Sequence, residues 1–120
     1  MTITKYQSGM IGQQEAESYL AAKGYRILER NYRVRTGEID LIARFENYIV
    51  FIEVKYRRGV KFGFPREAVS IAKQRQIVRT AMHYITVQNL SDQDFRFDVV
   101  EVLDQNGLKV NHIENAFDAY

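Results

Sequence analysis

Two short stretches decide the fold of this chain: GEIDLIAR at residues 37–44 and YIVFIEVK at residues 48–55. Both are rich in the β-branched and aromatic residues that favour strands, and Glu46-Asn47 between them is typical of a turn. The second stretch is apolar at consecutive positions from Ile49 to Ile52, which predicts a strand buried on both faces. Together they predict a central hairpin around which the other elements pack.

Charged residues stand at the end of this buried strand. Glu53 and Lys55 are two positions apart, so they share one strand face, about 7 Å from each other. Asp40, on the paired strand, can reach the same face. Such charges rarely enter a core unpaired, which leaves two explanations: a reaction site, or a buried salt bridge that holds the hairpin in register. Buried ion pairs seldom stabilise a protein more than apolar packing does, and this favours a reaction site.

The rest of the chain predicts an α/β domain. A helix is expected from Gly9 to Lys23, with residues 1–8 as a loose leader, Ser8 as N-cap and Gly24 as the stop signal. The other expected elements are an irregular strand at 25–34, a helix from Ser70 to about Gln88, strands at 95–103 and 108–113 around a turn at 105–107, and a short tail at 115–120. The order α-β-β-β-α-β-β predicts a central mixed sheet of about five strands, flanked by helices.

Composition limits the class of protein. With 120 residues, 46% of them hydrophobic, the chain is expected to form one domain over residues 1–120. The absence of Cys excludes disulfides and thiolate metal sites. The sequence shows neither a signal peptide nor an apolar run of membrane-spanning length, so we expect a cytoplasmic protein without membrane association.

Basic residues gather in the middle of the chain, although the net charge is only +2. Between Lys23 and Arg79 there are fourteen basic and six acidic residues, a balance of +8. From Thr80 to the end there are two basic and seven acidic residues, a balance of −5. This asymmetry favours a side that faces a polyanion such as nucleic acid, with a solvated mixed-charge surface as the alternative.

Residues 56–66 contain two glycines and the only proline, which predicts a mobile electropositive loop directly after Lys55. Two aromatic residues in it, Phe62 and Phe64, are expected to pin the loop to the core rather than stack on bases. The residues expected to contact nucleic acid are Arg57, Arg58, Lys61, Arg66 and, on the following helix, Lys73.

The charged cluster resembles the active site of the PD-(D/E)XK nuclease superfamily, in which an Asp precedes a Glu-x-Lys on the adjacent strand. Asp40 supplies the Asp, and Glu53-Val54-Lys55 supplies the Glu-x-Lys. Glu17 matches the helix glutamate of many members, including archaeal Holliday-junction resolvases. The fuller pattern resembles the YraN-like family of bacterial predicted endonucleases over nearly the whole chain, through GYRILERNY at 24–32, RFDVV at 96–100 and NAF at 115–117.

The resemblance implies a restriction-endonuclease-like fold and a metal-dependent endonuclease that hydrolyses phosphodiester bonds in DNA, branched or damaged DNA included. It implies catalytic roles for Asp40, Glu53, Lys55 and Glu17, and a metal held by Asp40, Glu53 and the backbone carbonyl of Val54. Hard oxygen ligands suit Mg²⁺ or Mn²⁺, which lowers the pKa of a bound water. Lys55 would stabilise the charge of the transition state, and Glu17 would act through a metal-bound water.

Two other functions stay open at this point. One is a nucleic-acid-binding module of the same fold with little or no hydrolytic activity, because folds of this kind also host binding functions. The other is a protein-interaction domain, supported only by the aromatic content. The presence of all four expected catalytic residues favours the enzyme. A homodimer is an arrangement that the sequence leaves open.

Overall fold

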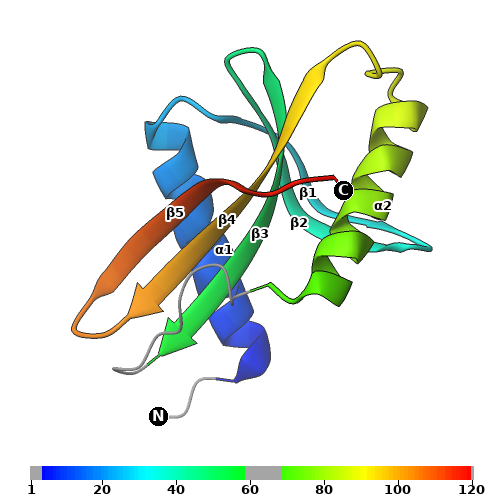
Figure 1. The fold of residues 1–120 in the computed structure, drawn as a ribbon. Coiled ribbons are helices and arrows are strands. Elements are labelled where there is room, and N and C mark those ends of the chain that lie inside the picture. The colour runs from blue at the N-terminus through cyan, green and yellow to red at the C-terminus, as the bar shows by residue number, and fades with distance from the viewer. Residues whose placement is uncertain (1–3, 59–68, 120) are drawn as a thin grey trace.

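The computed structural model describes residues 4–58 and 69–119. It has the order α-β-β-β-α-β-β and one mixed sheet of five strands, which confirms the predicted α/β class (Figure 1). The elements are α1 (Lys5–Ala22), β1 (Arg26–Val34), β2 (Gly37–Phe45), β3 (Tyr48–Arg58), α2 (Ile71–Val87), β4 (Asp94–Asp104) and β5 (Leu108–Phe117).

The strands lie in the order β1-β2-β3-β4-β5, and only β3 and β4 run parallel. Parallel neighbours need a crossover connection, and α2 lies within that connection. β3 is therefore the central strand, hydrogen-bonded on both sides, as its continuous apolar run predicts.

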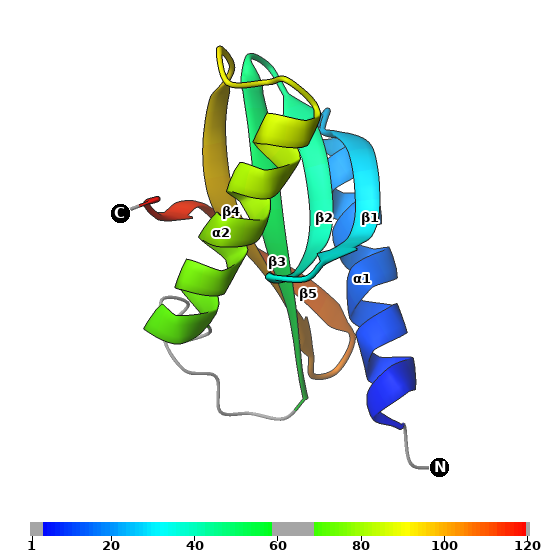
Figure 2. The same ribbon diagram turned by 90° about the vertical axis from the view of Figure 1, so that its right-hand side faces the viewer.

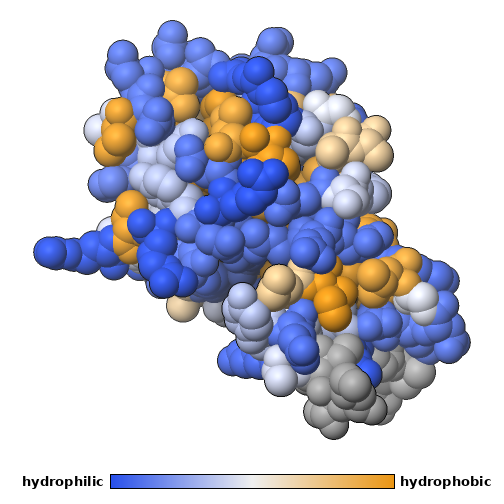
Figure 3. Space-filling model, turned by 180° about the vertical axis from the view of Figure 1, so that it is seen from behind, coloured by the Kyte–Doolittle hydropathy of each residue, from blue (hydrophilic) through white to orange (hydrophobic). Residues whose placement is uncertain are grey.

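The helices cover opposite faces of the sheet (Figure 2). Side chains of β3 alternate between the two layers: Val50 and Ile52 pack with α1, and Ile49 and Phe51 pack with α2. Seen from the α1 side, the surface is mostly hydrophilic, and its hydrophobic side chains form separate groups rather than one continuous patch (Figure 3). Among the described residues, neither helix is long and apolar enough to span a membrane.

The first helix begins earlier than predicted. Its N-cap is Thr4, whose side chain accepts from the amide of Gln7 while the Gln7 side chain accepts from the amide of Thr4. This capping box satisfies two free amides at once and starts the helix at Lys5, so the predictions of a leader through residue 8 and of Ser8 as N-cap are wrong. Gly24 does end the helix, in the left-handed region at φ 97°.

Two strands are longer than predicted. β3 runs to Arg58, so residues 56–58 lie on a strand and not in a loop. β5 runs to Phe117, so residues 115–117 lie on a strand and not in the predicted tail, and the Phe117 ring stacks on Phe97 at 5.1 Å between centroids. The predictions for Lys61, Phe62, Phe64 and Arg66 fall outside the described residues.

A buried polar network on the α1 side joins β4 to β5. Asp98 is fully buried and accepts hydrogen bonds from Arg96 Nε at 2.9 Å, His112 Nε2 at 2.7 Å and the Asn115 amide at 3.0 Å. These donors hold the pKa of Asp98 below its usual range in spite of its burial. The Tyr25 hydroxyl also donates to Asp98, so the network ties the segment after α1 to this end of the sheet.

Candidate active site

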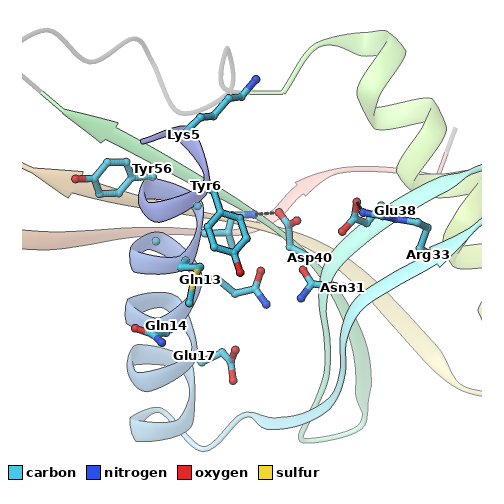
Figure 4. Close-up of a pocket in the computed structure, with 14 residues that line it drawn as sticks. Lys5, Tyr6, Gln13, Gln14, Glu17, Asn31, Arg33, Glu38, Asp40 and Tyr56 are labelled. Atoms are coloured by element: carbon cyan, nitrogen blue, oxygen red, sulfur yellow. Dashed lines mark hydrogen bonds and ion pairs between the residues drawn. The ribbon is translucent and has the colours of Figure 1, made fainter. Parts of the chain in front are cut away.

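Asp40 stands where the β2–β3 ladder stops. The paired residues run from Phe45 with Tyr48 to Leu41 with Ile52. Beyond that point the amide of Val54 donates to Asp40 Oδ2 at 2.8 Å, so a side chain takes the place of a backbone partner (Figure 4). The N–H and C=O of one strand residue point to the same side, and the Val54 carbonyl therefore also faces β2.

The strands are irregular at this position. Ile39 and Ile42 both pack in the layer beneath α2 although they are three residues apart, so the alternation of side chains breaks at Asp40 between them. On the neighbouring strand the register places Asn31 opposite Asp40, and Asn31 has φ 51°, a left-handed conformation unusual for a residue other than glycine. Such irregularities re-aim side chains and are frequent next to active sites.

Glu53 is the buried member of the site, with 5% of its surface exposed. Burial, followed by the charge of Asp40 and a hydrogen bond with Asp40, raises the pKa of this carboxyl to about 7, although Lys73 and Lys55 act to lower it. The buried carboxyl of Glu53 therefore ionises with difficulty near neutral pH while the carboxylate of Asp40 lies beside it. A proton or a cation between them relieves the repulsion.

Two ammonium groups lie near Glu53. Lys55 Nζ is 3.6 Å from Glu53 Oε2, and its side chain stays 35% exposed, so it bridges the buried carboxylate and solvent. Lys73, predicted as a nucleic-acid contact, lies in the first turn of α2, where its charge acts on Glu53 and its Nζ donates to Gln76 Oε1 at 3.2 Å. Gln76 could not be recognised from the sequence, because an amide on a helix carries no signal until its neighbours are known.

Glu17, the fourth expected catalytic residue, is bound to an arginine and not to the carboxyl groups of Asp40 and Glu53. Its Oε1 accepts from Arg30 Nε at 2.7 Å, and it lines the same groove as Asp40. Across residues 4–58 and 69–119, no three His, Asp or Glu side chains converge into a ready metal cluster. The structure therefore brings together Asp40, Glu53 and Lys55, and holds Glu17 apart in an ion pair.

Arg57, the first of the residues expected to contact nucleic acid, is bound to a buried carboxylate of the protein itself. Arg57 Nε donates to Glu101 Oε2 at 2.9 Å, and Glu101 is 1% exposed. The parallel register of β3 and β4 sets Glu101 opposite Lys55, two residues from Arg57. A lone Glu within the otherwise apolar run 99–103 is the sequence signal that could have indicated such a partner. Arg58, the next residue, is exposed.

A groove of about 860 Å³ lies between α1 and strands β1 to β3. Asp40 and Val54 form part of its lining, and Tyr6 and Gln13 of α1 line it from the opposite side (Figure 4). Glu38 also lines the groove, and its Oε2 pairs with Arg33 Nη2 at 2.9 Å.

The donor set fits a hard divalent cation. Asp40 and Glu53 supply carboxylate oxygens, and the Val54 carbonyl faces the same side of β3 as the amide that reaches Asp40. Mg²⁺ is commonly held by one or two carboxylates and keeps several waters, so a complete protein cage is not required. The crowding that raises the pKa of Glu53 is what a bound cation would relieve. A zinc site would instead call for His or Cys ligands.

Comparison with known proteins places the chain in a family. Residues 12–102 match the family described as "Uncharacterised protein family UPF0102". The chain is 49% identical over 119 residues to a UPF0102 protein of Lachnoclostridium phytofermentans, covering 98% of each chain. It is 47% identical over 113 residues to one of Clostridioides difficile, covering 92% of this chain and 96% of the relative. The family match spans most of the chain, and both relatives align almost from end to end, so this protein belongs to the UPF0102 family.

Proposed function

We propose that this protein is a metal-dependent endonuclease of the PD-(D/E)XK type that hydrolyses phosphodiester bonds in DNA, branched or damaged DNA included. The observation that carries the proposal is the crowded carboxylate pair Asp40 and Glu53 beside Lys55, at the point where the β2–β3 ladder ends. Strongly perturbed carboxyl groups next to a cation are typical of reaction sites.

Each residue has a role that follows from its contacts. Asp40, Glu53 and the Val54 carbonyl would hold Mg²⁺ or Mn²⁺. When bound, the ion supplies a water of lowered pKa and polarises the phosphoryl group. Lys55, anchored by Glu53 yet open to solvent, binds the phosphate oxygens and stabilises the charge that develops on them. Glu17, held by Arg30 on the α1 side of the groove, would act only through a metal-bound water.

The salt-bridge explanation fits the same contacts less well. In a stabilising ion pair the cations hold the pKa of the carboxyl below its usual value. Here the pKa of Glu53 is raised to about 7, because burial and Asp40 outweigh Lys55 and Lys73. The cluster therefore costs stability when no cation occupies it, which is expected of a site kept for function.

The proposed substrate is cytoplasmic DNA, with Arg58 and Lys73 as proposed phosphate contacts among the described residues. Arg57 contributes indirectly, because its guanidinium already binds Glu101. Contacts of this kind bind phosphates without reading sequence, which agrees with a nuclease that selects the shape of DNA rather than its sequence.

The test is cleavage by purified protein with Mg²⁺ or Mn²⁺ of supercoiled plasmid, linear duplex, four-way junction, flap, single-stranded DNA and RNA. We expect Lys55→Ala to lower the single-turnover rate about 100-fold or more while DNA binding stays nearly unchanged. Lys109→Ala, an exposed lysine on β5, is the matched control.

Equal rates for wild type and Lys55→Ala would contradict the assigned role. Salt-dependent DNA binding without cleavage of any substrate in either metal would instead indicate the binding module.

A further inference from the structure

An exposed aromatic side chain lines the groove beside Asp40. Tyr6, in the first turn of α1, is 76% exposed, and its ring stands between α1 and the strand that carries Asp40 (Figure 4). Although it is so exposed, this aromatic side chain forms part of the lining of a concave site.

Hydrogen-bonding amides line the groove from both sides. Gln13 extends from α1 and Asn31 from β1, and their side chains converge on the space near Asp40 (Figure 4). Each amide offers both donors and an acceptor, the combination that recognises the edge of a nucleobase.

Two ion pairs neutralise charges around the groove, and Lys5, in the first turn of α1, is a further basic residue in its lining. Arg33 binds Glu38 at 2.9 Å, and Arg30 binds Glu17 at 2.7 Å. A surface that follows the phosphates of a duplex requires cations free to bind them. This groove therefore suits the aromatic and amide parts of a nucleotide better than its backbone.

We propose that the groove is a nucleobase subsite that receives one unpaired nucleotide adjacent to the scissile phosphate. The inference rests on the proposed nuclease function and defines its substrate class as DNA with single-stranded nucleotides at the cleavage point. Tyr6 stacks on the base, and Gln13 and Asn31 bind its edge. The volume of about 860 Å³ lies in the range of sites for small ligands, and a base inside a paired duplex does not reach it.

Binding without metal tests the subsite independently of cleavage. Fluorescence anisotropy in EDTA would compare a labelled single-stranded 12-mer with the matched duplex. We expect Tyr6→Ala to weaken single-strand binding roughly 5- to 150-fold, the range for loss of one base–aromatic stack, and Tyr6→Phe to bind like wild type. Tyr48→Ala, at a tyrosine 37% exposed at the start of β3, is the matched control.

Two further measurements sharpen the test. An abasic residue scanned through the 12-mer should weaken wild-type binding at one position and have no further effect there in Tyr6→Ala, because both changes remove the same contact. The salt dependence of binding should be the same for wild type and Tyr6→Ala, since stacking releases no counterions.

The possible results separate the two proposals. If Tyr6→Ala binds the single strand like wild type, or weakens duplex binding equally, the subsite is wrong whatever the cleavage assay gives. If Tyr6→Ala loses single-strand binding selectively while wild type cleaves no substrate with metal, the subsite stands as a binding site and the nuclease assignment fails.

Discussion

Replacing Glu53 by glutamine removes a buried negative charge while keeping the shape of the side chain. Burial, followed by the charge of Asp40, raises the pKa of Glu53 from its ordinary value of 4.5 to about 7. The folded state therefore binds this proton more tightly than the unfolded state, and the free energy of unfolding falls as pH rises from about 4.5 to about 7. The difference between 7 and 4.5, at about 1.36 kcal/mol per pH unit, corresponds to about 3 kcal/mol.

Without divalent metal, we expect the free energy of unfolding of Glu53→Gln to exceed that of wild type by about 3 kcal/mol at pH values well above 7. Near pH 4.5 the two free energies of unfolding should be close to each other. The gain appears only where the native carboxylate is forced to ionise. Urea denaturation in EDTA at both pH values measures the effect. Glu46→Gln, in the exposed turn between β2 and β3, is the matched control and should show no such difference between the two pH values.

At high pH, Mg²⁺ should reduce the difference in free energy of unfolding between Glu53→Gln and wild type. An ion between Asp40 and Glu53 stabilises wild type by about 1.4 kcal/mol at ten times its dissociation constant, and it stabilises Glu53→Gln much less. If Glu53→Gln is instead less stable than wild type at high pH without metal, Glu53 is an ionised partner of Lys55. The site would then be a structural salt bridge.

The remaining predictions concern the metal, the basic residues and the buried network. Asp40→Ala should abolish Mn²⁺ binding in calorimetry, whereas Asp40→Asn in EDTA should keep or raise the melting temperature; equal Mn²⁺ binding by wild type and Asp40→Ala would contradict the ligand assignment. Arg58→Gln should lower the salt slope of DNA binding by about one phosphate contact without loss of stability. Arg57→Ala should destabilise the fold by about 2 kcal/mol in urea, because it leaves the carboxylate of Glu101 buried without its cation; unchanged stability would place Arg57 among the nucleic-acid contacts instead. Asp98→Ala should cost about 3–5 kcal/mol, measured in the same way, since it strands the buried donors around it, and a loss below 1 kcal/mol would refute that role.

Local patterns in the sequence predicted most of the fold. The apolar run before Glu53, the turn at Glu46-Asn47, the N-cap at Ser70 and the stop at Gly24 all act within a few residues, so each can be recognised from the chain alone. The start of α1 at Lys5 was missed because two capping signals, Thr4 with Gln7 and the later Ser8, compete within five residues.

The chemical surroundings of the site depend on pairing between distant strands. Glu101 meets Arg57 across 44 residues because β3 and β4 run parallel in one register, and no local pattern reports a register. Glu17 binds Arg30 because α1 lies against β1, which also forms the groove. The sequence alone was enough to name Asp40, Glu53 and Lys55 as the charged residues of the site. The raised pKa of Glu53 and the separation of the cluster from Glu17 follow from how the sheet and the helices pack, because burial and distance are properties of the folded chain.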